Sequence, residues 1–195
     1  METLIAPEEI ANEWVPKYAG LTMSKANFLK WESDDVFVYE FNDGLLEPII
    51  GMKPTEIYLV NRLTRRFLTT DAFGQGGTLM PEADCWLTES QMRRPDLSFY
   101  TEAQIGQLAA GERVIPAFVI ELISEYDVHY RTGNKLREYF EAGVKVVWWV
   151  LPPFKTVEVY TSPKTVVIAS DADSISAAPA LPDFTMTVED LFRPN

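Results

Sequence analysis

The sequence predicts one domain of the α/β (α+β) class over residues 1–195, with a mixed central β-sheet flanked by helices. Two kinds of segment alternate along the chain. Short runs rich in Val, Ile and aromatic residues favour strands, and longer stretches with apolar residues three or four apart favour helices. Apolar residues make up 47% of the chain, which is enough for one full core. No repeat, low-complexity tract or linker interrupts this pattern.

Helical features mark residues 1–33, which we expect to pack on the domain as a helical segment. Pro7 is followed by acids and by apolar residues at helical spacing up to Val15, and Ser24 is a candidate N-cap for a second, short helix.

A β-hairpin is expected next. The apolar runs 36–41 and 45–50 flank Asp43-Gly44, and an Asp-Gly pair between two such runs is a strong hairpin signal. Glu40 falls near the end of the first run, where an acid on a strand usually faces solvent.

The remaining elements follow from the same signals. The helix at 54–69 has its arginines on the wet side, and Thr101 with Gln104 forms a candidate capping box. Trp148 and Trp149 are consecutive in a strand and therefore point to opposite faces. In chain order we expect a helix at 54–69, a glycine loop at 74–77, strands at 83–88 and 97–100 with a turn at 89–92, a helix from 102 to near 111, a strand at 118–123, a polar stretch at 124–134, a helix ending at Gly143, strands at 146–151, 156–160 and 165–169, a loop or short edge strand at 171–180, and a helix capped by Thr187.

The composition restricts cellular location and partners. The single Cys85 suits a reducing compartment, and the start Met1-Glu2-Thr3 lacks the basic and apolar blocks of a signal peptide. No apolar run approaches the roughly twenty residues of a membrane span. We therefore expect a soluble, cytoplasmic protein.

A net charge of −12 argues against indiscriminate binding to DNA, because Lys and Arg must neutralise phosphates. The basic clusters are Arg62, Arg65 and Arg66, and Arg93 and Arg94.

Two carboxylates stand out because each belongs to a short, apolar, strand-like run. Asp96 opens the run at 97–100, and Glu121 lies inside the run at 118–123. An ionised acid in such a place must be paired, protonated or bound to a metal. Lys135 follows on the next predicted helix. Two acids on neighbouring strands with a lysine nearby suit a divalent metal that activates water against a phosphodiester.

Simpler interpretations of these residues remain open. Asp96 follows Pro95 and suits a turn or a strand start, because Asp bonds its own backbone there. Glu121 and Lys135 suit a buried structural ion pair. His129 is the only histidine, and without a matching nucleophile it suits a surface or capping position.

An ordered set of motifs spanning nearly the whole chain resembles the putative restriction endonuclease family of the PD-(D/E)XK nuclease superfamily, known in bacteria as a domain of unknown function. In chain order the motifs are Tyr39-Glu40 with Asp43-Gly44, Arg94-Pro95-Asp96-Leu97, Val119-Ile120-Glu121-Leu122-Ile123-Ser124, Lys135 with Tyr139, Ala142-Gly143-Val144, Val147-Trp148-Trp149-Val150-Leu151-Pro152, and Leu181-Pro182-Asp183-Phe184 before Leu191-Phe192.

The resemblance implies a restriction endonuclease-like core and a Mg²⁺-dependent (or Mn²⁺-dependent) endonuclease. Asp96 and Glu121 would hold the metal, and Glu40 would add an acid from an earlier element. The superfamily's lysine usually lies two residues after the second acid, where this chain has Ile123, so Lys135 on the following helix is the candidate. The implied partner is nucleic acid, with DNA favoured, and the superfamily's habit of dimerising implies a homodimer.

The chain departs from the family pattern at one further place, and two alternative functions remain open. Where the resembled family often has a histidine, at the start of the 54–69 helix, this chain has Thr55-Glu56. The alternatives to an endonuclease are a catalytically silent interaction module that keeps the fold, and a phosphoesterase acting on a small molecule or on nucleic acid held by a partner.

Overall fold

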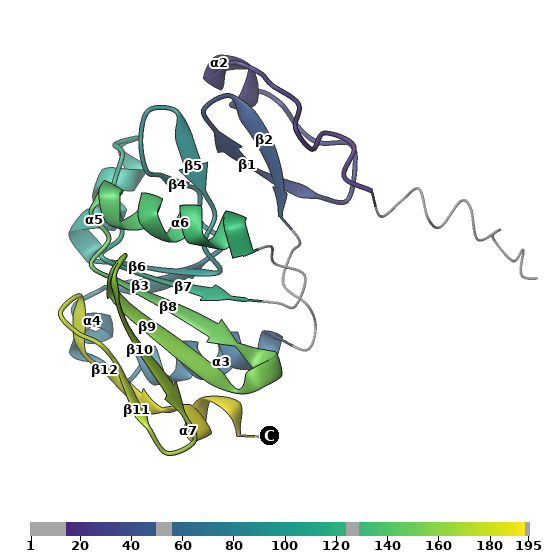
Figure 1. Ribbon diagram of the computed structural model, residues 1–195. Helices are drawn as coiled ribbons and strands as arrows, with labels where there is room; N and C mark the ends of the chain where they lie inside the picture. The colour runs from purple at the N-terminus through teal and green to yellow at the C-terminus, as the bar shows by residue number, and fades with distance from the viewer. Residues whose placement is uncertain (1–14, 50–55, 124–128, 194–195) are drawn as a thin grey trace, which may run out of the picture. The chain divides into compact units, whose positions relative to one another are not determined.

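The computed structural model describes residues 15–49, 56–123 and 129–193 (Figure 1). Internal contacts divide the chain into two compact units. The hairpin unit comprises Met1–Gly51 and Thr88–Arg93, and the sheet unit comprises Met52–Leu87 and Arg94–Asn195. The helix expected from Pro7 lies outside the described residues. The expectation of one domain over residues 1–195 stays a prediction.

The hairpin unit is built around the predicted hairpin. Strand β1 (Val38–Asn42) pairs antiparallel with β2 (Leu45–Ile49). The turn residues Asp43 and Gly44 have φ of 48° and 92°, the left-handed values that a tight hairpin turn requires. The other side of β1 pairs with β5 (Gln91–Arg93), so the turn predicted at 89–92 is wrong at its end.

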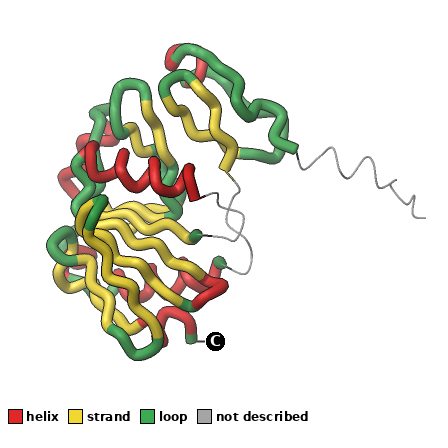
Figure 2. The backbone as a smooth tube through the Cα atoms, in the orientation of Figure 1, coloured by secondary structure: helices red, strands yellow, loops and turns green. Residues whose placement is uncertain are grey.

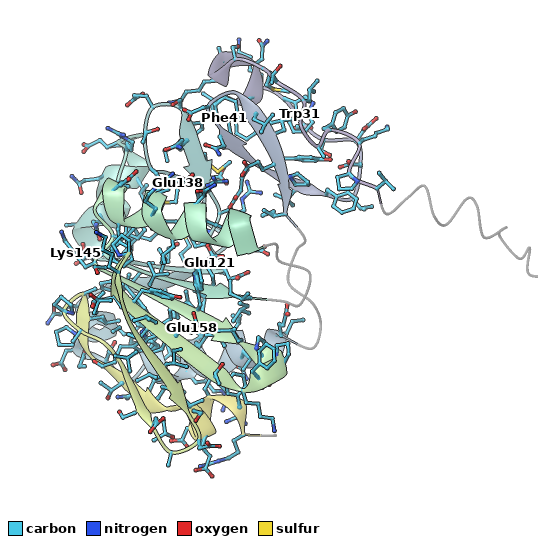
Figure 3. The ribbon with its side chains drawn as sticks, viewed as in Figure 1. Trp31, Phe41, Glu121, Glu138, Lys145 and Glu158 are labelled. Atoms are coloured by element: carbon cyan, nitrogen blue, oxygen red, sulfur yellow. The ribbon has the colours of Figure 1, made fainter. Side chains whose placement is uncertain are left out.

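Aromatic side chains fill the hairpin unit. Helix α2 (Lys25–Phe28) starts at Ser24, whose side chain accepts a hydrogen bond from the Asn27 backbone as predicted. Phe28 stacks on Phe41 with ring centroids 4.8 Å apart, and Trp31 meets Tyr39 edge to face. Phe41 and Trp31 are labelled in Figure 3. These rings fasten the short helix to β1.

The sheet unit confirms the predicted mixed sheet flanked by helices (Figure 2). Its strand order is β10-β9-β8-β7-β6-β3. Only β7 and β8 pair in parallel among the described strands, and α6 makes the crossover between them, as a parallel pair requires. The strands are β3 (Thr78–Pro81), β6 (Leu97–Tyr100), β7 (Phe118–Leu122), β8 (Val146–Leu151), β9 (Thr156–Ser162) and β10 (Thr165–Ser170).

The two faces of this sheet carry different cores. On one face Phe118, Trp148 and Phe184 pack together under α3 (Ile57–Phe67) and α7 (Val188–Phe192). The opposite face packs Val119 and Val147 against α6 (His129–Ala142). Trp148 belongs to the first core and Trp149 packs on the second, which confirms their predicted divergence.

Short elements complete the sheet unit, and several were not predicted. The capping box of Thr101 and Gln104 is present, and the Thr187 side chain caps α7. Helix α6 begins at His129, inside the stretch that we expected to be polar and irregular. The remaining elements are α4 (Asp71–Gly74), β4 (Cys85–Trp86), α5 (Glu102–Ala109), the 3₁₀ turn η1 (Pro152–Phe154), and the antiparallel pair β11 (Ser174–Ala177) and β12 (Leu181–Thr187).

The arginines of α3 are not all on a wet face, and this corrects the sequence interpretation. Arg66 Nε and Nη2 donate to the backbone carbonyls of Thr185 and Asp183, and Arg62 Nη1 donates to that of Asp190. Two of the three cations therefore fasten α3 to β12 and α7. Among the described helices, none is long and apolar enough to cross a membrane.

Candidate active site

The pairing of β6 with β7 places the two candidate acids side by side. The strands run antiparallel with Leu97 opposite Ile120 and Ser98 opposite Val119. One further step in the same register sets Asp96 opposite Glu121. The backbone N–H of Leu122 donates to Asp96 Oδ2 at 2.6 Å, which continues the ladder through a side chain. Directly opposed residues project to the same face of a sheet, so both carboxylates lie on the α6 face.

Among the described residues, Lys135 and Tyr139 of α6 both reach Glu121, whose position is marked in Figure 3. Lys135 Nζ lies 3.0 Å from Glu121 Oε1, and the Tyr139 hydroxyl donates to the same oxygen at 2.5 Å. Residues four apart on a helix share one face, which explains why both reach the same strand. Glu121 is only 7% exposed and Tyr139 is fully buried. The predicted proximity of Lys135 to Glu121 is therefore present in the structure.

The surroundings of Asp96 raise the pKa of its carboxyl group. Burial, followed by the negative charge of Glu121, raises the pKa of Asp96 from 3.8 to about 8. The Leu122 N–H and the Lys135 ammonium act in the opposite direction but do not overcome this rise. Burial and the charge of Glu121 therefore favour the protonated form of Asp96 when no cation is bound.

A third acid near this pair was not singled out by the sequence. Glu56 is the residue before α3 and is 9% exposed, and its charge contributes to the raised pKa of Asp96. The available signal was its position, because the resembled family often has a histidine at this helix start. The sequence showed only that the histidine was replaced.

Glu40 lies in the hairpin unit and is not the solvent-facing acid that strand position suggested. It is 3% exposed, and its Oε2 lies 3.0 Å from Arg93 Nη1. Arg93 also pairs with Glu47 of β2, so one guanidinium bridges two acids on neighbouring strands. A role for Glu40 in chemistry stays a prediction.

The basic residues of the second cluster are also paired. Arg93 is buried with Glu40 and Glu47, and Arg94 pairs with Asp84 in the sheet unit. Both arginines of this basic cluster therefore have acidic partners within the chain.

The residues at Asp96 and Glu121 fit a hard divalent cation. Two adjacent carboxylates, the buried Glu121 and the half-buried Asp96 with its strongly raised pKa, form a site where a cation would relieve the crowding of negative charge. No group of three or more His, Cys, Asp or Glu side chains is arranged for a metal in the part of the chain that the structure describes.

A solved structure shares this fold. The crystal structure of a putative nuclease belonging to DUF820 from Anabaena variabilis matches with a TM-score of 0.70. The match covers 87% of this chain and 97% of that one at 18% identity, so it shows a common fold. No curated protein matches the sequence significantly.

A family model matches nearly the whole described chain. The model is Uma2, described as "Putative restriction endonuclease", and it covers residues 26–189. That range contains both strands of the acid pair, the helix that carries Lys135, and the hairpin that carries Glu40. The chain therefore belongs to the Uma2 family of putative restriction endonucleases.

Proposed function

We propose that this protein is a metal-dependent endonuclease that hydrolyses phosphodiester bonds of nucleic acid, with DNA as the substrate. The observation that carries the proposal is the convergence of Asp96, Glu121 and Lys135 on one face of the sheet. The family and the shared fold add support, since both are nuclease-like.

Each residue has a role in the proposed reaction. Asp96 and Glu121 would hold Mg²⁺ or Mn²⁺, and Asp96 would bind the cation in its deprotonated form. The metal, when bound, lowers the pKa of a coordinated water and stabilises charge on the phosphate. Lys135 donates to the phosphate oxygen on which charge develops, or holds the attacking water in place. Glu40 of the hairpin unit is a further candidate acid for the reaction.

The substrate must be bound with little help from the overall charge. The chain carries a net charge of −12, and several of its arginines are paired internally. Affinity for bare duplex is therefore expected to be weak, because affinity for DNA comes largely from Lys and Arg that neutralise phosphates. Tests of cleavage belong at low ionic strength.

The test is nicking of supercoiled plasmid by the purified full chain with Mg²⁺ or Mn²⁺, beside Asp96→Asn, Glu121→Gln and Lys135→Met. Glu158→Gln is the matched control, because Glu158 is a half-buried acid of the same sheet whose carboxylate accepts from Tyr160. The proposal predicts that the three site variants lose cleavage and that Glu158→Gln keeps it. A contaminating nuclease would cut in every sample.

The second candidate is a catalytically silent interaction module, which the Lys135 to Glu121 ion pair specifically favours. In that case the lysine neutralises Glu121 permanently and no metal is needed. Isothermal titration decides between the two, since a silent module binds neither Mg²⁺ nor Mn²⁺. Binding of metal without cleavage of plasmid would instead direct attention to a phosphoesterase with a different substrate.

A further inference from the structure

We infer that Tyr139 is a positioning residue that holds the Glu121 carboxylate in place for the metal while Lys135 contacts the phosphate or the attacking water. This inference rests on the proposed function and deepens it. It starts from one contact, the hydrogen bond from the Tyr139 hydroxyl to Glu121 Oε1 at 2.5 Å.

The two donors that reach Glu121 differ in mobility. Tyr139 is fully buried in the core between α6 and the sheet, where Val119, Leu136 and Val147 surround it. Its ring has few rotatable bonds and packing fixes it, so its hydroxyl is held in one place. Lys135 has a four-carbon stem with more freedom, and its side chain is 18% exposed. The tyrosine is thus the fixed donor and the lysine the movable one.

The two donors also differ in charge. The Lys135 ammonium is a cation beside a carboxylate that is proposed to bind a cation, so the lysine and the metal compete. The Tyr139 hydroxyl is neutral and donates a charge-assisted hydrogen bond without competing. A carboxylate that binds metal is commonly oriented by such a neighbour, and loss of the neighbour weakens metal binding.

A division of labour follows from these differences. When the metal binds, Glu121 no longer needs the ammonium as a counter-ion, and Lys135 can turn to the phosphate. Glu121 would then lose one of its two α6 donors at the moment when its orientation matters most. Tyr139 remains on Oε1 and keeps the carboxylate in its rotamer.

The experiment compares metal binding by the full chain and by two variants using isothermal titration with Mn²⁺ and Mg²⁺. Tyr139→Phe removes only the hydroxyl and keeps the ring, and should weaken metal binding by about 10-fold to 100-fold. Lys135→Met removes the competing cation and should bind metal as tightly as the parent or more tightly. Of these two variants on one helix face, only Tyr139→Phe is thus expected to bind metal more weakly than the parent.

Tyr160→Phe is the matched control, because Tyr160 also donates to a glutamate of the same sheet, Glu158 at 2.6 Å, away from the proposed metal. Its metal affinity should equal that of the parent. Cleavage supplies a second readout: excess metal should restore turnover in Tyr139→Phe but not in Lys135→Met. A purely structural role for Tyr139 would lower thermal stability without this rescue.

The outcomes separate this inference from the proposed function. If the parent binds neither metal, the proposed metal centre fails, and the inference fails with it. If the parent binds metal and Tyr139→Phe binds it equally well, the inference alone is overturned. Weakened binding in both Tyr139→Phe and Tyr160→Phe would also overturn it, because the effect would then be general to the sheet.

Discussion

Lys135 of α6 approaches Glu121 of β7 to 3.0 Å, although fourteen positions separate them in the sequence. The crossover from β7 to β8 brings the helix back over the strand that it follows, and so delivers an ammonium to the acid. This contact is consistent with a structural ion pair and also with a catalytic lysine before metal and substrate bind. The experiments below are chosen because the two cases respond differently.

Glu121→Gln separates these cases most directly. In a metal site the variant loses Mg²⁺ binding by at least about 100-fold, since a neutral amide is a poor ligand for a hard cation. Its stability should fall by about 1 to 3 kcal/mol, because Lys135 loses its charged partner. Titration calorimetry and urea unfolding measure the two effects. If the parent binds no metal and Glu121→Gln loses only stability, Glu121 and Lys135 form a structural pair.

Asp96 should make the metal-free protein less stable as pH rises. Its pKa of about 8 in the folded chain lies above the ordinary 3.8, so the folded state binds a proton that the unfolded state releases. The contribution is fully present below about pH 4 and is lost as pH approaches 8. Asp96→Asn should remove this dependence and stabilise the protein at pH 8 by about 1 to 3 kcal/mol. Thermal unfolding from pH 5 to 8.5 checks it, and equal pH profiles would contradict it.

Metal binding should have the opposite dependence on pH. A proton and a cation compete for Asp96, so apparent Mg²⁺ affinity should fall about tenfold for each unit below pH 8 and level off above it. Calorimetry in buffers of different ionisation enthalpy counts the proton released. A flat affinity between pH 6 and 8 would mean that Asp96 is not a ligand.

Glu40→Gln tests the acid of the hairpin unit. The amide can still accept from Arg93, so the free energy of unfolding should change by less than about 2 kcal/mol. If Glu40 supports hydrolysis, cleavage should nevertheless fall more than tenfold. Glu47→Gln is the natural control, because Glu47 pairs with the same arginine. Equal cleavage by both variants would assign Glu40 to folding alone.

Phe184→Ala should affect the fold without altering the acids. Phe184 is fully buried on the sheet face opposite Glu121, stacked on Trp148 with centroids 5.4 Å apart. The cavity should cost about 3 to 5 kcal/mol. Chemical unfolding measures this loss, and the variant should bind metal with the parent's affinity well below its melting temperature. Weaker metal binding in the folded variant would show that the first core controls the site.

The candidate acids were predictable because each violates a local rule. A carboxylate in an apolar strand is costly, so Asp96 and Glu121 stood out by composition, and Lys135 was found on the helix that follows. Tyr139 was also within reach, since it lies four positions after Lys135 and therefore shares its helix face. The proximity of Glu56 to Asp96 could not be predicted in this way, because it comes from the packing of α3 on the sheet. Only the histidine of the resembled family marked its position.

The elements that sequence missed form through tertiary pairing. Strands β3 and β12 contain Thr, Met and Pro in place of continuous apolar runs, so they depend on their partners β6 and β11. The arginines of α3 were misassigned for a related reason. Periodicity identifies which residues share a helix face, but carbonyls more than a hundred positions away decide whether that face meets solvent.

The alignment of the two acids is a property of the β6 to β7 ladder, and this determines which changes in length the chain can accept. Because side chains alternate, inserting a single residue within β6 would turn Asp96 to the far side of the sheet from Glu121. Residues 101–117, which join the two strands, lie outside the ladder. That connection can lengthen or shorten between homologues while the acids stay opposed, so variation in length should collect there and be absent from β6.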